Sequence, residues 1–191
     1  MNHLSISSAI SKPITSLKIT SIALLCLLCS ACTAIPTNVT PLSQFEVQRY
    51  LGKWYEIARL DNSFEKGLTR VTAEYSMRDD GGITVLNQGY SIKDKIWQSA
   101  QGKAYFVDTP DIGHLKVSFF GPFYASYIIY QLDNTHYQYA FVTGYNKDYL
   151  WLLARTPTVD QQIIQQFIDS AKQRGFDVNK LIMVDQNANE K

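Results

Sequence analysis

The sequence predicts an all-β fold: an eight-stranded up-and-down antiparallel barrel with one C-terminal α-helix packed on its side. From Lys53 onward, short runs rich in Val, Ile, Tyr, Phe and Thr recur, and turn residues separate them. Eight such runs in succession can close on themselves, which leaves no exposed sheet edge. An amphipathic stretch follows the last run. These observations together favour a barrel over an open sheet.

Gly, Pro, Asn and Asp mark the connections between the expected strands. The strands are expected at residues 53–60, 69–78, 83–90, 96–107, 114–120, 125–132, 137–143 and 149–155. Between the second and third, Asp80-Gly81-Gly82 predicts a hairpin turn, because glycine accepts the positive φ that such turns require. The connections are short, and short connections join antiparallel neighbours.

One helix is expected after the eighth strand. Thr158 and Gln161 have the spacing of a capping box, and apolar residues recur at helical intervals from Val159 to Ala171. Gly175 is expected to end the helix. Its other face is polar, so the helix is expected to pack on the barrel by one side. Residues 181–184 are expected to add a short last strand.

The first 31 residues predict a signal peptide that is removed on export. Lys12 and Lys18 precede an apolar run that is too short for a lasting transmembrane helix. The small residues Ser30 and Ala31 then stand directly before Cys32. This order resembles the lipobox of bacterial lipoproteins, which implies that Cys32 is acylated and serves as the lipid anchor. Cleavage of an ordinary signal peptide near residue 34 is the alternative.

The segment after the anchor is expected to be a tether. Thr33 follows the cysteine, and by the usual bacterial sorting pattern this implies the outer membrane. We therefore expect a protein that is lipid-anchored to the bacterial outer membrane. The predicted organisation is a signal peptide at 1–31, an acylated cysteine and flexible tether at 32–45, the barrel with its helix at 46–185, and a disordered tail at 186–191.

Charge and cysteine usage exclude several classes of protein. The formal net charge is +1 at pH 7, which gives no electrostatic case for nucleic acid binding. All three cysteines fall at or before Cys32, so no disulfide framework can hold the domain together. Core packing must stabilise the fold.

The segment YLGKWYEIAR, residues 50–59, opens the first strand. Gly52 allows a close backbone approach, and the Trp54 indole is large enough to plug one end of a barrel. Arg155 ends the eighth strand, which lies beside the first in a closed barrel. Its guanidinium can stack on the Trp54 ring, a contact worth about 1–2 kcal/mol. We therefore expect Gly52, Trp54 and Arg155 to close the barrel.

This pairing of G-x-W with a C-terminal arginine resembles the signature of the lipocalin family, and of its bacterial outer-membrane lipoproteins in particular. The segments YLGKWYEIARLDNSFEKGL, YSMRDDGGITVLNQGY, GKAYF, LKVSFFGPFYASY and DYLWLLARTPT are similar to that family and are spread over residues 49–185. The resemblance implies a lipocalin barrel that holds fatty acids or (lyso)phospholipids. The chain departs from many eukaryotic relatives because it lacks cysteines for barrel disulfides.

The interior of an eight-stranded barrel holds either its own side chains or one small ligand. Lys103 and Lys116 are expected to point outward, which sets the alternation of their strands. The inward positions are then apolar or aromatic, without a buried charge, and suit an acyl chain. The predicted ligand-binding residues are Tyr75, Val85, Asn87, Ala100, Ala104, Val117, Phe119, Tyr127, Ile129, Val142, Tyr149 and Trp151.

Candidates for chemistry are few. His114 and His136 stand at strand or turn edges without a nearby cysteine or second histidine, and they are expected to be solvated. The sequence contains no nucleophile elbow, phosphate-binding loop or zinc-protease motif. We expect no catalytic residue, no metal and no cofactor.

The leading hypothesis is a lipid-anchored protein that stores or transports fatty acids or (lyso)phospholipids for membrane maintenance. The polar head group is expected at the mouth, near Arg59, Asp61 and Lys66. The alternative is an envelope interaction or scaffold lipoprotein whose barrel carries no lipid. In that case the segment FFGPFY, residues 119–124, binds a partner or a second copy as a homodimer. An enzyme that acts on a lipid is a third reading.

Overall fold

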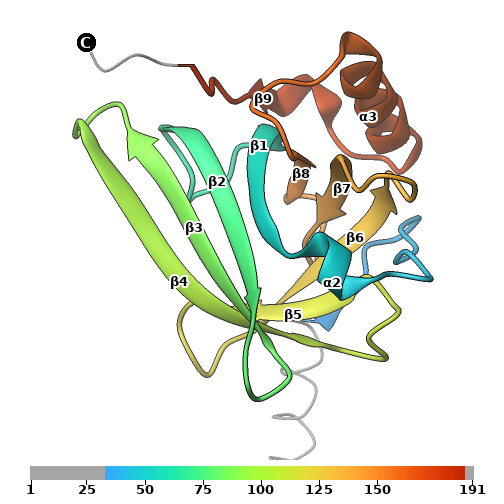
Figure 1. Cartoon of the computed structure of the whole chain (residues 1–191). Helices are drawn as coiled ribbons and strands as arrows, with labels where there is room; N and C mark the ends of the chain where they lie inside the picture. The colour runs from blue at the N-terminus through green and yellow to red at the C-terminus, as the bar shows by residue number, and fades with distance from the viewer. Residues whose placement is uncertain (1–32, 188–191) are drawn as a thin grey trace, which may run out of the picture. The chain divides into compact units, whose positions relative to one another are not determined.

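Eight antiparallel strands form a closed barrel in the computed structural model, which describes residues 33–187 (Figure 1). The strands are β1 Gly52–Leu60, β2 Leu68–Met77, β3 Ile83–Ser91, β4 Ile96–Phe106, β5 His114–Ser118, β6 Ala125–Leu132, β7 Tyr139–Thr143 and β8 Leu150–Ala154. Each pairs with the next along the chain, and β1 pairs with both β2 and β8. The predicted up-and-down barrel is confirmed.

Register brings the small inward residues of β4 opposite the inward residues of β3. Val85 faces Gly102 and Asn87 faces Ala100 across the pair. The hairpin turn before β3 forms where Asp80-Gly81-Gly82 predicted it, with Gly81 at a φ of +80°. The long strands β2, β3 and β4 make one wall of the barrel in Figure 1. Small side chains on that wall leave room inside the barrel.

Strand β1 changes partner halfway along its length. Its first half pairs with β2, and its last residues pair with β9, Leu181–Met183, which confirms the predicted last strand. Beyond Tyr55, β1 no longer pairs with β2, and the residues after β9 lie between the two strands there. The Gln186 amide donates to the carbonyl oxygens of Glu56 (2.7 Å) and Val71 (2.9 Å). The predicted disordered tail is therefore wrong at Gln186, and residues 188–191 lie outside the described range.

Helix α3, Gln161–Gln173, packs against the outer face of the barrel beside β7 and β8 (Figure 1). The Phe167 ring meets the Phe141 ring edge-on, with 5.1 Å between the ring centroids. The predicted capping box is wrong at the first turn. Asp160 is the N-cap, and Thr158 lies outside the helix. Gly175 follows the helix at a φ of +79°, and the 3-10 turn η2, Val178–Lys180, leads to β9.

The N-terminal segment packs on the barrel, which corrects the predicted tether at 32–45. Val39 and Phe45 are buried. The Leu42 amide donates to the Ile129 carbonyl and the Phe45 amide to the Asp111 carbonyl, both at 2.8 Å. These apolar side chains gain more by burial than the chain loses by ordering. A short helix, α2, Val47–Tyr50, leads into β1.

The predicted signal peptide and Cys32 lie outside the described residues, so acylation of Cys32 stays a prediction. Among residues 33–187, no helix is long and apolar enough to cross a membrane.

Candidate functional site

One end of the barrel is closed by Trp54 and Arg155, as the sequence predicted. The Trp54 side chain is fully buried, and its Nε1 donates to the Tyr50 carbonyl at 2.8 Å. The Arg155 guanidinium carbon lies 3.9 Å from the centroid of the Trp54 ring. Its Nη1 donates to the Lys53 carbonyl at 3.0 Å and its Nη2 to the Arg49 carbonyl at 2.7 Å. The stack and these donors tie β8 to the start of β1.

Gly52 allows this arrangement because its φ is +88°, a backbone conformation that residues with a side chain rarely adopt. Space does not require glycine here, because a Cβ would lie 3.6 Å from Arg155 Nη1, an ordinary van der Waals distance. The three closure residues predicted from the sequence therefore lie together.

The barrel encloses a cavity of about 690 Å³ that opens at the end opposite Trp54. Its wall is mainly apolar and aromatic, and strands β1 to β6 and β8 contribute to it. Most of the predicted ligand-binding residues line it: Tyr75, Val85, Asn87, Ala100, Ala104, Val117, Phe119, Tyr127, Tyr149 and Trp151.

Two predicted ligand-binding residues do not line the cavity. Ile129 and Val142 pair with each other across β6 and β7, and both are fully buried. They belong to the core cluster inside the barrel, where neighbouring side chains cover them. Alternation predicted the correct face for both residues, but it could not show how far the cavity extends.

A chain of three tyrosine hydroxyls lies inside the barrel. Tyr127 shares hydrogen bonds with Tyr50 (2.7 Å) and with Tyr75 (2.8 Å). Burial raises the pKa of all three phenols, so they stay protonated at neutral pH. The sequence predicted Tyr75 and Tyr127 in the wall but missed Tyr50, because it precedes the first strand. These hydroxyls give the apolar cavity a polar spot.

Two carboxyl groups also line the cavity, which contradicts the expected absence of buried charge. Glu56 and Glu65 are both buried. Arg59 Nη1 donates to Glu56 Oε1 at 2.7 Å, and its Nη2 donates to the Glu65 carbonyl at 2.9 Å. Glu65 Oε2 also accepts from Trp151 Nε1 at 3.0 Å and from the Asn62 amide. Arg59 is therefore an interior residue and not a solvated mouth residue.

A β-bulge in β1 produces this buried group. Residues three apart on a regular strand point to opposite faces. The register shifts between Glu56, which faces Leu153, and Ala58, which faces Leu152. The extra residue turns Arg59 to the same inner face as Glu56. Alternation from Trp54 would have placed Glu56 inward, but the bulge leaves no signal in the sequence.

The other two residues expected near the head group, Asp61 and Lys66, are exposed and do not line the cavity. His114 also departs from the prediction, because it is buried in β5 and its Nε2 shares a hydrogen bond with Ser126 Oγ at 3.1 Å. His136 is exposed as expected. Among the described residues, no group of three or more His, Cys, Asp or Glu side chains could hold a metal ion.

Stability is expected to depend on pH through Glu56. Burial, with a smaller contribution from Glu65, raises its pKa well above the ordinary value, and Arg59 only partly opposes this. The folded protein therefore keeps a proton that the unfolded chain loses near pH 4.3. The stabilisation is complete below that pH, and it is lost as the pH rises through the pKa that Glu56 has in the folded protein. Urea unfolding between pH 5 and 8 measures this effect. The free energy of unfolding should fall less with rising pH in Glu56→Gln than in the parent protein.

The control for this prediction is Glu74→Gln, the same change at an exposed position. Burial lowers the pKa of His114, which gives the opposite slope below pH 6.5. His114 is present in all three proteins, so differences between their curves isolate the carboxyl groups. Parallel curves for the parent and Glu56→Gln would show that Glu56 does not titrate in this range.

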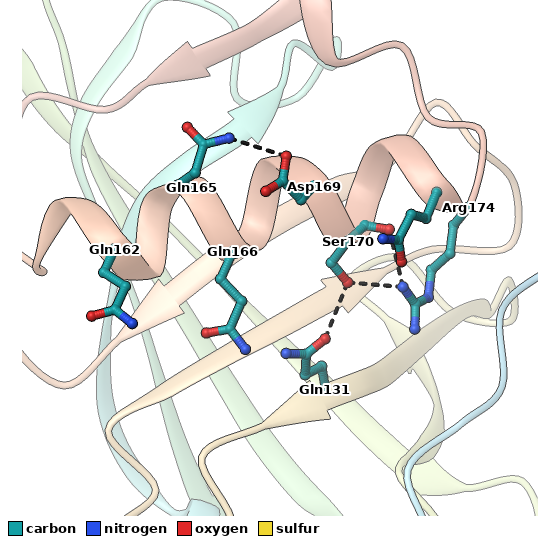
Figure 2. A pocket seen from close by; sticks show the side chains of 8 residues that line it. Gln131, Gln162, Gln165, Gln166, Asp169, Ser170 and Arg174 are labelled. Carbon is teal, nitrogen blue, oxygen red and sulfur yellow. Dashed lines mark hydrogen bonds between the residues drawn. The ribbon is translucent and has the colours of Figure 1, made fainter.

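A second, open groove of about 480 Å³ lies between α3 and β6 (Figure 2). Its lining is polar: Gln131, Gln162, Gln165, Gln166, Asp169, Ser170, Gln173 and Arg174. Ser170 Oγ donates to Gln131 Oε1 at 3.1 Å and accepts from Arg174 Nη1 at 2.8 Å. These bonds join the helix to the barrel, so we assign the groove a structural role.

Comparison with known proteins supports the same fold. Residues 45–186 match the family described as Lipocalin-like domain. The chain is 60% identical over 152 residues to the outer membrane lipoprotein Blc of Vibrio cholerae, which covers 80% of this chain and 89% of that protein. It is 51% identical to the Escherichia coli K12 protein of the same name, over 79% of this chain and 85% of that protein.

Solved structures with little sequence similarity share the fold. The cockroach allergen Per a 4 superposes with a TM-score of 0.62 at 17% identity, over 80% of this chain and 95% of its own. Insecticyanin from Manduca sexta gives a TM-score of 0.62 at 19% identity, over 80% and 86%. These structures show the fold alone. The bacterial relatives are named as outer membrane lipoproteins, and they confirm the predicted lipid-anchored localisation at the outer membrane.

Proposed function

The chain belongs to the lipocalin family, and on this premise we propose that its barrel binds a lipid with one acyl chain, a fatty acid or a lysophospholipid, for storage or transport at the outer membrane. The observation that carries the proposal is the cavity of about 690 Å³, open at one end and lined mainly by apolar side chains. This volume lies within the range of roughly 300–1,000 Å³ that is usual for small-molecule sites. Each methylene buried there contributes about 0.8 kcal/mol.

The polar groups of the wall suggest how such a lipid is oriented. An acyl chain can extend along the apolar wall formed by Val85, Ala104 and Val117. Its head group then stays at the mouth, where water is available. Glu56 and Glu65 add carboxyl oxygens to the wall, so a head group with a hydrogen-bond donor fits that part of the wall.

The test is to look for lipid in the purified protein. The contacts that hold the barrel join residues within 33–187, so a chain that starts at Thr33 should keep the fold and lacks the predicted anchor. We expect native mass spectrometry to show a bound species of one acyl chain, and solvent extraction to release it. A barrel that is purified empty and does not take up added fatty acid or lysophospholipid would contradict the proposal.

The alternative remains an interaction or scaffold lipoprotein without a lipid. Phe120 and Phe123 favour it, because 82% and 76% of these side chains are exposed. The open apolar cavity gives such a protein no advantage, so we favour lipid binding. Ser126 lines the cavity and shares a hydrogen bond with His114, but the rest of the wall is mainly apolar, so we propose a binding role.

A further inference from the structure

The mouth of the barrel carries a rim of exposed apolar side chains. Phe64 lies in the loop after β1, Phe120 and Phe123 lie in the loop after β5, and all three border the cavity. The hairpin that joins β3 to β4 adds Ile92, Ile96 and Trp97. Their exposed fractions range from 51% for Trp97 to 82% for Phe120. We call these six side chains the rim.

Exposure of this kind is costly in water, and soluble proteins rarely gather such side chains around one opening. The rim side chains come from three separate segments that the up-and-down strand order places at the same end of the barrel. Phe120 and Phe123 stand on a loop, residues 119–124, that carries no charged residue. The rim is therefore suited to leave water for an apolar phase.

Charge differs between the two ends of the barrel. The loops at the mouth, residues 61–67, 92–95 and 144–149, are neutral overall, because four lysines are offset by Asp61, Glu65, Asp94 and Asp148. The loops at the closed end, residues 78–82, 107–113 and 133–138, are acidic, because they carry five aspartates and only one lysine or arginine, Arg78. Phosphate head groups repel an acidic surface but not a neutral one. A phospholipid surface therefore fits the mouth better than the closed end.

The packed N-terminal segment keeps the barrel close to the membrane. Pro36 and Val39 are both buried, so only residues 33–35 separate the predicted anchor Cys32 from the packed chain. These residues span at most about 15 Å when fully extended. That is less than the diameter of a domain of this size, whose radius of gyration is about 15 Å. Some face of the barrel must therefore lie near the bilayer.

We propose that the mouth of the barrel docks on a phospholipid bilayer, with the rim side chains inserted among the head groups and the upper acyl chains. In this orientation the cavity opens directly into the bilayer, so a lipid chain can pass between the two without crossing water. The docking does not require that the cavity hold a lipid, and it can therefore be tested separately.

Trp97 is a built-in reporter for this contact, because it belongs to the rim but does not line the cavity. The experiment uses the full acylated chain in vesicles of phosphatidylethanolamine and phosphatidylglycerol with brominated acyl chains. Trp151 lines the cavity and is replaced by Phe in every protein, so that lipid inside the barrel gives no signal. Side chains at an interface lie about 5–10 Å deep, where bromine quenches an indole. We expect Trp97 emission to fall by about half.

Three matched variants assign the signal. Replacing Trp97 by Phe should remove the quenching, since Trp54 is buried at the closed end. Phe120→Asp with Phe123→Asp should reduce it at least fivefold. Met77→Asp is the control, because Met77 is 40% exposed at the closed-end terminus of β2. It should leave the quenching unchanged.

Two results would overturn the proposal. One is emission from Trp97 that is equal in brominated and ordinary vesicles. The other is a rim that is covered by a second copy, seen as chemical cross-linking between Phe120→Cys chains together with loss of quenching at high protein density. Either result leaves the lipid-extraction experiment unaffected.

Discussion

Replacing Ala100 by Trp is expected to weaken lipid binding by about 50-fold. Ala100 lines the cavity and lies opposite Asn87 in the pair of β3 and β4. An indole at this position would occupy the space of about three methylenes of an acyl chain. At about 0.8 kcal/mol per methylene, the loss is about 2.4 kcal/mol, and each 1.4 kcal/mol is tenfold in affinity. Titration with a fluorescent fatty acid and with a lysophospholipid measures the change.

The neighbouring residue provides the control for this substitution. Gln101 follows Ala100 on β4 and does not line the cavity, because successive side chains on a strand point to opposite faces. Gln101→Trp adds the same side chain outside the barrel and should bind lipid as the parent protein does. Equal affinity in Ala100→Trp and Gln101→Trp would show that the cavity is not the lipid site.

Replacing Trp54 by Ala should lower the free energy of unfolding by about 3–5 kcal/mol, the cost of removing a large buried aromatic side chain. Trp54 is fully buried and packs between Tyr50 and the Arg155 guanidinium. Its loss leaves a void at the closed end and removes the ring on which Arg155 stacks. Urea unfolding followed by far-UV circular dichroism measures the change without relying on tryptophan emission.

Trp97→Ala is the matched control, because this tryptophan is 51% exposed on the rim. It should cost less than about 1 kcal/mol, as is usual for surface substitutions. Trp54→Phe should retain part of the lost stability, because a phenyl ring still offers Arg155 a face. If Trp54→Ala were no less stable than Trp97→Ala, the closure would not hold the barrel together.

Much of the fold could be predicted from local patterns. Alternation in β3 and β4 placed Val85, Asn87, Ala100 and Ala104 on the inner face, because side chains on a strand alternate with a period of two. Outward lysines set the phase where apolar residues occurred on both faces. The contact of Trp54 with Arg155 could also be predicted, because a closed barrel brings its first and last strands together.

Other features depend on partners that are distant in the sequence. The flexible tether was predicted from small polar residues, but Val39 and Phe45 find apolar surface on the folded barrel. Gln186 was predicted to be disordered, yet its amide satisfies two carbonyl groups left free where β2 departs from β1. A local pattern carries no information about which backbone groups the sheet leaves unpaired.

The sequence by itself determined the strand order, the closure and the mainly apolar character of the interior. These follow from the alternation within each strand, from the turn residues between strands, and from the residues at the start of the first strand and the end of the last. Only the tertiary structure decided that Arg59 and Glu56 share the inner face. A single extra residue in β1 reverses the alternation beyond it, and its position depends on pairing with β8, nearly a hundred residues away. The same holds for the rim, whose side chains lie at one end of the barrel only because the strands alternate in direction around it.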